Sequence, residues 1–129
     1  MQYNQQQTAA IDTRGKGVKN ILVSAGAGSG KTAVLAERVL SIITDTTNTT
    51  DIDNMLIMTF TINAAAEMRG RIASKLKEKR NELIISEPDS DKLKNIQKQL
   101  ILLNKASITT IDSFCNSLVK RYFYMLDID

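Results

Sequence analysis

Eight residues near the N-terminus have the composition and spacing of a loop that cradles phosphate groups. They are Ala25, Gly26, Ala27, Gly28, Ser29, Gly30, Lys31 and Thr32. Glycines allow positive φ angles, so several backbone N–H groups can turn inward around phosphate oxygens. The Lys31 ammonium is placed to reach the β- and γ-phosphates, and the Thr32 hydroxyl is placed to bind Mg²⁺. The pattern predicts a site for a nucleoside triphosphate, with ATP and Mg²⁺ as the expected ligands.

The segments on either side have the character that such a loop requires. Asn20 to Ser24 is an aliphatic run of strand length that leads directly into the glycines. From Lys31 onward, apolar residues recur at helical spacing, at Val34, Leu35, Val39, Leu40 and Ile42 or Ile43. A helix that begins at Lys31 would point the positive end of its dipole at a bound anion. An ordinary glycine-rich turn is the alternative, but it has no need for Gly-Lys-Thr at the start of a helix.

The rest of the chain alternates aliphatic runs with segments of helical periodicity. Runs at 55–59 and 107–110 have the composition of buried strands. Helices are expected over 5–13, 31–43, 63–83, 91–104 and from 112 or 113 to about 126. This order predicts an α/β fold in which a small parallel sheet of three strands is flanked by helices. Since Asp129 follows directly on a helix, we expect a fragment of a longer chain.

The composition fits a globular domain and leaves the choice of partner open. Of the 129 residues, 43% are hydrophobic and 24% are charged, and the net charge is +3. This mild positive charge permits nucleic-acid binding without requiring it. Basic residues do gather in one segment, at Arg69, Arg71, Lys75, Lys77, Lys79 and Arg80. A solvated helix face is the simpler interpretation of such a run.

Two further features bear on the cellular compartment. Cys115 is the only cysteine, so an internal disulfide framework is excluded. The polar N-terminus lacks the apolar core of a signal peptide, and no apolar run approaches the roughly 20 residues that cross a bilayer. We therefore expect a cytoplasmic protein with no membrane partner.

With these residues in view, the chain resembles the N-terminus of superfamily 1 helicases of the UvrD/Rep type. It is most similar to the AddA-type subunit of bacterial helicase–nucleases, which process broken DNA ends. The resemblance implies that residues 1–129 form the first part of a RecA-like motor domain with a three-layer P-loop NTPase fold. It also implies an ATP-dependent DNA helicase that moves 3′ to 5′, has an exonuclease elsewhere in the full-length chain and an AddB-type partner, and acts in double-strand break repair.

Two of the four similar blocks concern the nucleotide. Gln7-Thr8-Ala9-Ala10-Ile11 is similar to the Q motif of the family, in which the glutamine reads adenine. The amide of Gln7 can donate and accept at once, which suits the adenine edge. The second block, Val23 to Arg38, contains the phosphate loop, and the resemblance implies that Arg38 lies beside the base. The alternatives are an exposed glutamine on a short helix and a solvated arginine.

The third block, Met58 to Ile72, resembles motif Ia, which contacts single-stranded DNA in the family. The residues that it carries over as DNA contacts are Thr59, Phe60, Thr61 and Asn63. An aromatic ring at the end of a strand can stack on a base, and hydroxyls and helix N-terminal N–H groups can hold phosphates. The chain departs from the family at Ile62, where the family usually has Asn. Core packing is the alternative for Phe60.

The fourth block, Ser107 to Cys115 with its extension to Asp129, resembles motif Ib. Here Ser113 is carried over as a donor to DNA phosphate. The family usually has His where this chain has Asp112, and a carboxylate would repel a phosphate. We therefore expect Asp112 to be a helix N-cap. Core packing is the alternative for Phe114 and is the expectation for Cys115.

One part of an ATP-hydrolysing site is absent from the sequence. No aliphatic run ends in an acidic pair that could hold Mg²⁺ and position water. We therefore expect this piece to bind nucleotide without hydrolysing it, with the remaining machinery beyond Asp129. Two other hypotheses stay open: a regulatory or partition-type P-loop module that binds no DNA, and a degenerate remnant, which the departures at Ile62 and Asp112 would suit.

Overall fold

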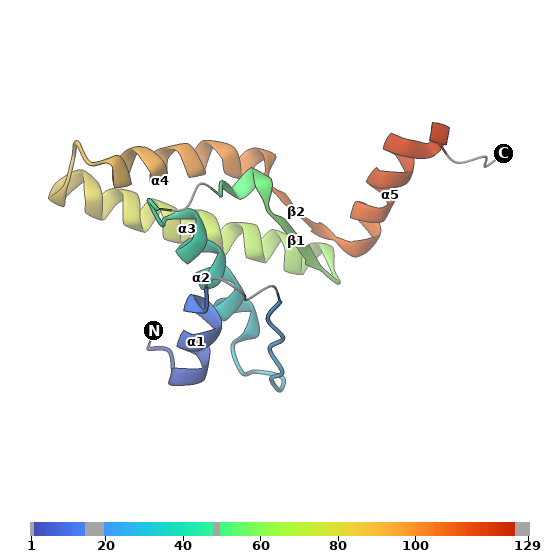
Figure 1. Cartoon of the computed structure of the whole chain (residues 1–129), viewed down its shortest axis with the longest axis horizontal. Coiled ribbons are helices and arrows are strands. Elements are labelled where there is room, and N and C mark those ends of the chain that lie inside the picture. Colours follow the sequence, from blue (N-terminus) through green and yellow to red (C-terminus); the bar gives the residue numbers. More distant parts are fainter. Residues whose placement is uncertain (1, 15–19, 48–49, 126–129) are drawn as a thin grey trace.

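The computed structural model of the chain describes residues 2–14, 20–47 and 50–125, and it contains helices, short 3₁₀ turns and a small sheet (Figure 1). In chain order the elements are α1 (Gln5–Asp12), α2 (Lys31–Ile43), η1 (Ile52–Asn54), β1 (Leu56–Thr59), α3 (Ile62–Ser86), α4 (Asp91–Leu102), η2 (Leu103–Lys105), β2 (Ser107–Thr110), α5 (Ile111–Tyr122) and η3 (Phe123–Met125). The bounds of the helices and of the two strands that form depart from expectation by at most three residues, at the end of α3. The predicted end of the last helix near Leu126 lies outside the described residues.

The sheet consists of β1 and β2, which pair in parallel with Leu56 opposite Ser107 and Thr59 opposite Thr110. Side chains alternate between the two faces of a strand, and Ile57 and Ile108 are a register pair on one face. Both side chains are buried in the same core as residues of α3. The sheet therefore rests on α3, and the long connection from β1 to β2 is the helical hairpin of α3 and α4 (Figure 1).

The core lies where α2 and α4 meet α3. Its fully buried side chains include Leu40 and Ile43 of α2, Met68, Ile72 and Leu76 of α3, and Ile52 of η1. These positions recur at helical spacing, so each helix presents one apolar stripe to the others. α1 packs against α2 below this core, and α5 projects away from the body after β2 (Figure 1).

Polar side chains fasten the α3–α4 hairpin at its base. Gln99 is fully buried, accepts a hydrogen bond from the Ile52 N–H at 2.9 Å and donates to Asp51 and Asn95 at 2.6 and 3.2 Å. Arg69 donates to the main-chain carbonyls of Leu103 and Ala106. Except for Asn95 of α4, these partners lie in or directly beside η1 and η2, so the bonds hold the hairpin in register with both strands.

The strand predicted at Asn20–Ser24 is absent from the sheet, so that prediction is wrong. The segment has no strand pairing in the described residues, and Leu22 within it is 96% exposed. An aliphatic run favours extended backbone, but a strand also needs a neighbour whose N–H and C=O groups pair with its own. The described residues supply a two-stranded sheet instead of a three-stranded one.

Only two of the three expected layers, the sheet and the helix on one of its faces, are present in the described residues. One face of the sheet is covered by α3, whereas Leu56 and Met58 on the other face of β1 are 44% and 46% exposed. No helix of the described residues buries these two side chains. The structure supports a mixed α/β arrangement in which a small parallel sheet is flanked by helices. None of the helices in residues 2–14, 20–47 and 50–125 has both the length and the apolar character of a membrane span.

Candidate nucleotide and nucleic-acid sites

The phosphate loop bends through two glycines in the left-handed region. Gly28 has a φ of 75° and Gly30 a φ of 84°, and Gly30 is also the N-cap of α2. L-residues with a side chain rarely adopt such angles, so these two positions favour glycine. A β-carbon built on Gly26 or Gly28 would meet no atom within 4 Å. The loop therefore leaves open space in front of its backbone at the start of α2, as a bound phosphate requires.

The charged and hydroxyl groups of the loop turn back on its own carbonyls. The Lys31 ammonium donates to the carbonyl oxygens of Ala25 and Gly26, both at 2.8 Å. The Ser29 hydroxyl donates to the Gly26 carbonyl at 2.7 Å. Ala27 lies at the turn between them, and Thr32 is exposed in the first turn of α2. In this arrangement the Lys31 ammonium closes the loop, and a phosphate group would compete for it.

Gln7 of α1 lies directly against this loop. Its side-chain amide donates to the Ser29 carbonyl at 3.1 Å, and Asn4 and Gln7 form a reciprocal capping box at the start of α1. Sequence reasoning missed Asn4, although an Asn three residues before a Gln is a recognised N-terminal signature. Gln7 is thus a partly buried residue with defined partners, and the alternative of a merely exposed glutamine is wrong.

Arg38 of α2 reaches the last carbonyls of α1. Its guanidinium donates to the carbonyl oxygens of Ala10, Ile11 and Thr13 at 2.8, 3.3 and 3.2 Å. A helix leaves its last carbonyls without partners, and a cation at that end also suits the helix dipole. The alternative of a solvated arginine is therefore wrong. Its hydrogen bonds show that Arg38 anchors α1 to α2, a role that the sequence did not indicate.

These groups line one cavity of about 460 Å³ between α1, the loop and α2. Its walls are formed by Asn4, Gln6, Gln7, Ala10, Ile21, Val23, Ser24, Ala25, Ser29, Lys31, Val34, Leu35 and Arg38. The apolar side chains from the unpaired segment and from α2 face polar groups from the loop and from α1. This combination suits a ligand with a flat organic part and an anionic tail.

The described residues contain no cluster of three or more His, Cys, Asp or Glu side chains that could hold a metal. Of the residues predicted for the nucleotide site, Thr32 is the one whose hydroxyl suits Mg²⁺. Mg²⁺ takes one or two protein ligands together with phosphate oxygens at many nucleotide sites. The chemistry of the loop therefore fits Mg²⁺ that arrives with a triphosphate.

A second group of predicted residues meets at the carboxyl ends of the two strands. Thr59 and Thr110 are register partners there, and Phe60, which follows β1, is 89% exposed. Thr61 is the N-cap of α3, where its hydroxyl accepts from the Ala64 N–H at 3.1 Å. The alternative that Phe60 packs in the core is therefore wrong. The parallel pairing brings motifs Ia and Ib, some fifty positions apart, to one edge.

The N-cap of α5 is Thr110, and the expectation that Asp112 caps this helix is wrong. The Thr110 hydroxyl accepts from the Ser113 N–H at 3.1 Å and lies 2.8 Å from the Ser113 hydroxyl. The helix begins directly after the strand, which moves the cap two residues earlier than expected and places Asp112 in the first turn. Two helices, α3 and α5, consequently start at the same edge of the sheet, and their N-termini favour anions.

The remaining predicted residues of this region are exposed. Asn63 is exposed in the first turn of α3, and Ile62 beside it is 76% exposed. Cys115 is also exposed, so the expectation that it packs in the core is wrong, and Phe114 is partly buried. Since α5 projects away from the body, its side chains have few neighbours to bury them. A periodic apolar pattern alone cannot show whether its partner lies within the described residues.

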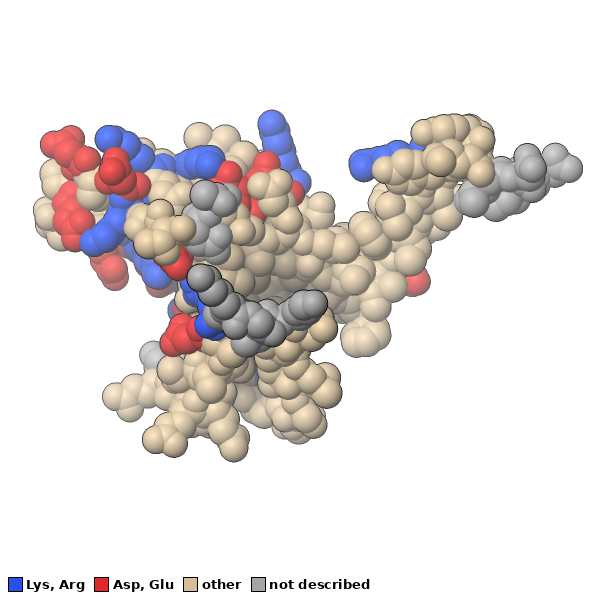
Figure 2. Space-filling model, in the orientation of Figure 1, with Lys and Arg blue, Asp and Glu red and all other residues tan. Residues whose placement is uncertain are grey.

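The basic run on α3 is largely paired. Arg69 donates to main-chain carbonyls, Arg71 pairs with Glu67 at 2.8 Å and Lys75 pairs with Glu37. On the visible face, basic and acidic side chains are mixed at the α3–α4 end of the molecule (Figure 2). This pattern differs from the single-sign patch of a nucleic-acid footprint. The interpretation as a solvated face holds for the exposed Arg71, Lys77 and Lys79. It does not hold for Arg69, Lys75 and Arg80, which are partly buried.

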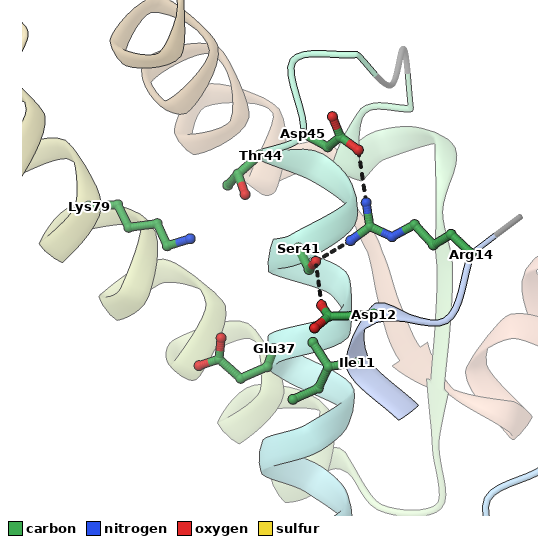
Figure 3. A pocket seen from close by; sticks show the side chains of 8 residues that line it. All are labelled: Ile11, Asp12, Arg14, Glu37, Ser41, Thr44, Asp45 and Lys79. Carbon is green, nitrogen blue, oxygen red and sulfur yellow. Dashed lines mark hydrogen bonds and ion pairs between the residues drawn. The ribbon is translucent and has the colours of Figure 1, made fainter. Parts of the chain in front are cut away.

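A second cavity, of about 390 Å³, lies between α1, α2 and α3 (Figure 3). Arg14 lines this cavity, where its guanidinium pairs with Asp45 at 3.0 Å and donates to the Ser41 hydroxyl. Glu37 and Lys79 lie across from these groups (Figure 3). Its lining residues are spread from position 11 to position 79, so no local motif could reveal this cavity from the sequence.

The chain belongs to the UvrD/REP helicase N-terminal domain family, which it matches over residues 3–129. It is 50% identical over 127 residues to the AddA-type subunit of the ATP-dependent helicase/nuclease from Thermoanaerobacter sp. (strain X514), covering 98% of this chain and 10% of that protein. The proteins of the same name from Clostridium botulinum (strain Alaska E43 / Type E3) and Bacillus cytotoxicus are 49% and 48% identical over 98% and 99% of the chain.

These comparisons confirm the resemblance to UvrD/Rep-type helicases and, among them, to the AddA-type subunit. Membership of the family supports the helicase class of enzyme and implies a P-loop fold. The chain spans about a tenth of the length of these relatives, with 10% of the Thermoanaerobacter protein and 9% of the Clostridium botulinum protein covered.

Proposed function

We propose that this chain is the ATP-binding first part of a motor domain in an ATP-dependent DNA helicase of the AddA type. The observation that carries the proposal is the cavity of about 460 Å³, which is lined by Gln7, by residues of the phosphate loop and by Arg38. Two separate sequence blocks supply these residues, Gln7 from one and the loop with Arg38 from the other. Their convergence is what a nucleotide site needs, because base and triphosphate must be held by one rigid arrangement.

In this proposal the loop holds the phosphates. The open space before Gly26 and Gly28 receives phosphate oxygens, and the N-terminus of α2 favours their charge. The Lys31 ammonium leaves the two carbonyls that it now contacts and binds the phosphates instead. The Thr32 hydroxyl holds Mg²⁺, which neutralises part of the phosphate charge when bound.

The base occupies the part of the cavity next to α1. The Gln7 amide retains a donor and an acceptor for the adenine edge, and the apolar side chains of Ile21, Val23 and Leu35 cover the ring faces. Arg38 lies at the wall of the same cavity, where its guanidinium plane is close to the base position while its N–H groups hold α1. This combination supports ATP as the nucleotide.

Single-stranded DNA is proposed to bind at the carboxyl edge of the sheet. Phe60 offers an exposed ring for a base, while Thr59, Thr61, Asn63 and Ser113 offer hydroxyl and amide donors beside two helix N-termini. The paired Thr59 and Thr110 hold both loops against one another. A strand of DNA that crosses this edge would touch both loops at once.

The activity of the whole protein is part of the same proposal. The relatives are named as helicase/nuclease subunits and are about ten times longer than this chain. We propose that the complete protein moves 3′ to 5′ on single-stranded DNA, has its exonuclease elsewhere, and acts in double-strand break repair in the cytoplasm with an AddB-type partner. Residues 1–129 are proposed to bind ATP and Mg²⁺ without hydrolysing ATP on their own.

The decisive experiment measures ATP binding and turnover by the intact natural polypeptide with Lys31→Ala. We expect ATPase activity to be lost and ATP binding to weaken. Lys77→Ala, which removes an exposed lysine of α3 remote from the cavity, is the matched control and should leave both unchanged. ATP turnover by Lys31→Ala at the rate of the unmodified protein would exclude the proposed site.

A regulatory P-loop module without DNA binding is the second candidate function. It shares the nucleotide cavity and differs at the carboxyl edge of the sheet. The exposure of Phe60, at 89%, favours the DNA motor because a module without a partner at this edge has no use for a solvated aromatic ring. An intact protein with no measurable affinity for single-stranded DNA at low salt would favour the regulatory module.

A further inference from the structure

The side-chain amide of Gln7 is bound at both of its ends. Its oxygen Oε1 accepts from the main-chain N–H of Asn4 at 2.9 Å, and its nitrogen Nε2 donates to the main-chain carbonyl of Ser29 at 3.1 Å. A β-carbon built on Gly30 would lie 3.5 Å from the same Nε2. The amide therefore packs directly against the junction of the loop and α2.

The bond to Ser29 is the single hydrogen bond, within residues 2–14, 20–47 and 50–125, that ties the loop to an element other than α2. The other bonds of the loop are internal, from Ser29 and Lys31 to the carbonyls of Ala25 and Gly26. When a phosphate takes the Lys31 ammonium, two of these internal bonds are lost. The bond from Gln7 then remains as an external restraint on the turn.

The bonding capacity of the amide leaves room for a second task. A carboxamide oxygen has two lone pairs and its nitrogen has two hydrogens, so one acceptor site and one donor site of Gln7 stay available. Gln7 is one of the residues that line the cavity. The capping box fixes which end of the amide faces Asn4 and which faces Ser29.

We infer that Gln7 is a positioning residue for the phosphate loop as well as a contact for the base. By holding the Ser29 carbonyl, it keeps the loop N–H groups aligned for a triphosphate even when no base is present. The inference rests on the proposed nucleotide site and goes beyond it, because it assigns to Gln7 an effect on the phosphates. It couples the base end of the cavity to the phosphate end through one side chain.

Inorganic tripolyphosphate with Mg²⁺ is the probe, because it carries the phosphates and no base. Its affinity and that of ATP are measured on the intact natural polypeptide with Gln7→Met, which has a similar length and no amide. The variant retains the Gln7 N–H bond to Asn4, so one half of the helix cap survives. We expect tripolyphosphate affinity to fall roughly three- to tenfold, as for one lost hydrogen bond. Gln5→Met, at an exposed position of α1 outside the residues that line the cavity, is the control and should bind as the unmodified protein does.

A second variant separates the helix cap from the loop bond. Gln7→Glu keeps an oxygen that can accept from Asn4 but turns a second oxygen toward the Ser29 carbonyl, where no bond can form. Gln5→Glu adds the same charge at a nearby exposed position outside the cavity and corrects for its repulsion of phosphate. We expect Gln7→Glu to weaken tripolyphosphate binding more than Gln5→Glu does.

The outcomes distinguish this inference from the function on which it rests. If Gln7→Met weakens ATP binding but leaves tripolyphosphate binding unchanged, Gln7 reads the base alone and the inference is overturned, while the ATP site stands. If the unmodified protein binds neither ATP nor tripolyphosphate, the proposed function fails and the inference fails with it. Loss of tripolyphosphate affinity in both Gln7 variants, beyond their Gln5 controls, supports the coupling.

Discussion

Thr59 and Thr110 lie opposite one another at the last paired position of β1 and β2, although 51 positions separate them (110 − 59). Each threonine is followed at once by a loop or helix start that the resemblance associates with DNA. Thr59 leads to Phe60, and Thr110 caps the helix that contains Ser113. The parallel pairing therefore places both proposed DNA contacts at one edge of the sheet.

Removal of the exposed aromatic ring in Phe60→Ala should weaken single-stranded DNA binding by roughly 1–3 kcal/mol, the usual worth of one base stacked on an aromatic ring. The free energy of unfolding should change little because the ring is 89% exposed. DNA affinity is measured by fluorescence anisotropy over a salt series, in which its logarithm should fall linearly with that of the salt concentration.

The matched control for this prediction is Ile85→Ala. Ile85 is 87% exposed near the end of α3, on the hairpin remote from the sheet edge. Its removal deletes a similar exposed apolar surface and should leave DNA affinity unchanged. Equal losses in both variants would argue that exposed apolar surface in general, and not the position of Phe60, governs binding.

Two glycine replacements should act in opposite directions. Gly28→Ala forces a side chain into a φ of 75° and should cost about 1–2 kcal/mol of stability. Gly70→Ala, in the exposed middle of α3 where a β-carbon meets no atom within 4 Å, should stabilise by roughly 0.5–1 kcal/mol. Urea unfolding of the two variants and the parent protein measures both effects. A stabilising Gly28→Ala would contradict the left-handed loop.

Loss of the Arg38 guanidinium should loosen α1. Arg38→Met leaves the carbonyls of Ala10, Ile11 and Thr13 without their donor, at a cost of about 1.5–3 kcal/mol for bonds to a charged group. Amide exchange in α1 should accelerate more than exchange in α3. Arg80→Met is a suitable control, since the Arg80 guanidinium contacts the side chain of the adjacent Asn81. Unchanged exchange in α1 would show that Arg38 does not anchor it.

At low pH, the contact that the Asp51 carboxylate makes between η1 and α4 should weaken. Hydrogen bonds from Lys98 and Gln99 lower the pKa of the Asp51 carboxyl from its ordinary value of 3.8. Because the folded-state pKa lies below the unfolded one, this stabilisation is complete above the unfolded value and is lost as the pH falls through the folded value. Asp51→Asn should therefore destabilise the protein at pH 7, by about 1–2 kcal/mol.

Below the lowered pKa, the free energies of unfolding of the parent protein and of Asp51→Asn should converge, since both side chains are then neutral. Urea unfolding at a series of pH values from 7 downward follows the difference. The control is Asp89→Asn, at an exposed position in the turn between α3 and α4. A difference that stays constant into strong acid would mean that the Asp51 charge contributes nothing.

Much of the local structure could be predicted from the sequence. The apolar spacing of α4, the β-branched run of β2 and the Gly-Lys-Thr start of α2 are each encoded within a few neighbouring residues. Such signals depend on backbone propensity and hydrogen bonds between near neighbours. The failure at Asn20–Ser24 has the opposite cause, because a strand exists only where another strand pairs with it, and that partner is not visible in a local pattern.

The sequence by itself determined the glycine-rich turn before α2, the family and the order of the helices. Glycine at positions of positive φ and helical apolar spacing are local requirements that few residue types satisfy. Only the tertiary structure decided what Gln7 and Arg38 contact, that Phe60 is exposed, and that Thr59 meets Thr110. These relationships join residues tens of positions apart, and packing among helices and strands, which no local pattern records, brings them together.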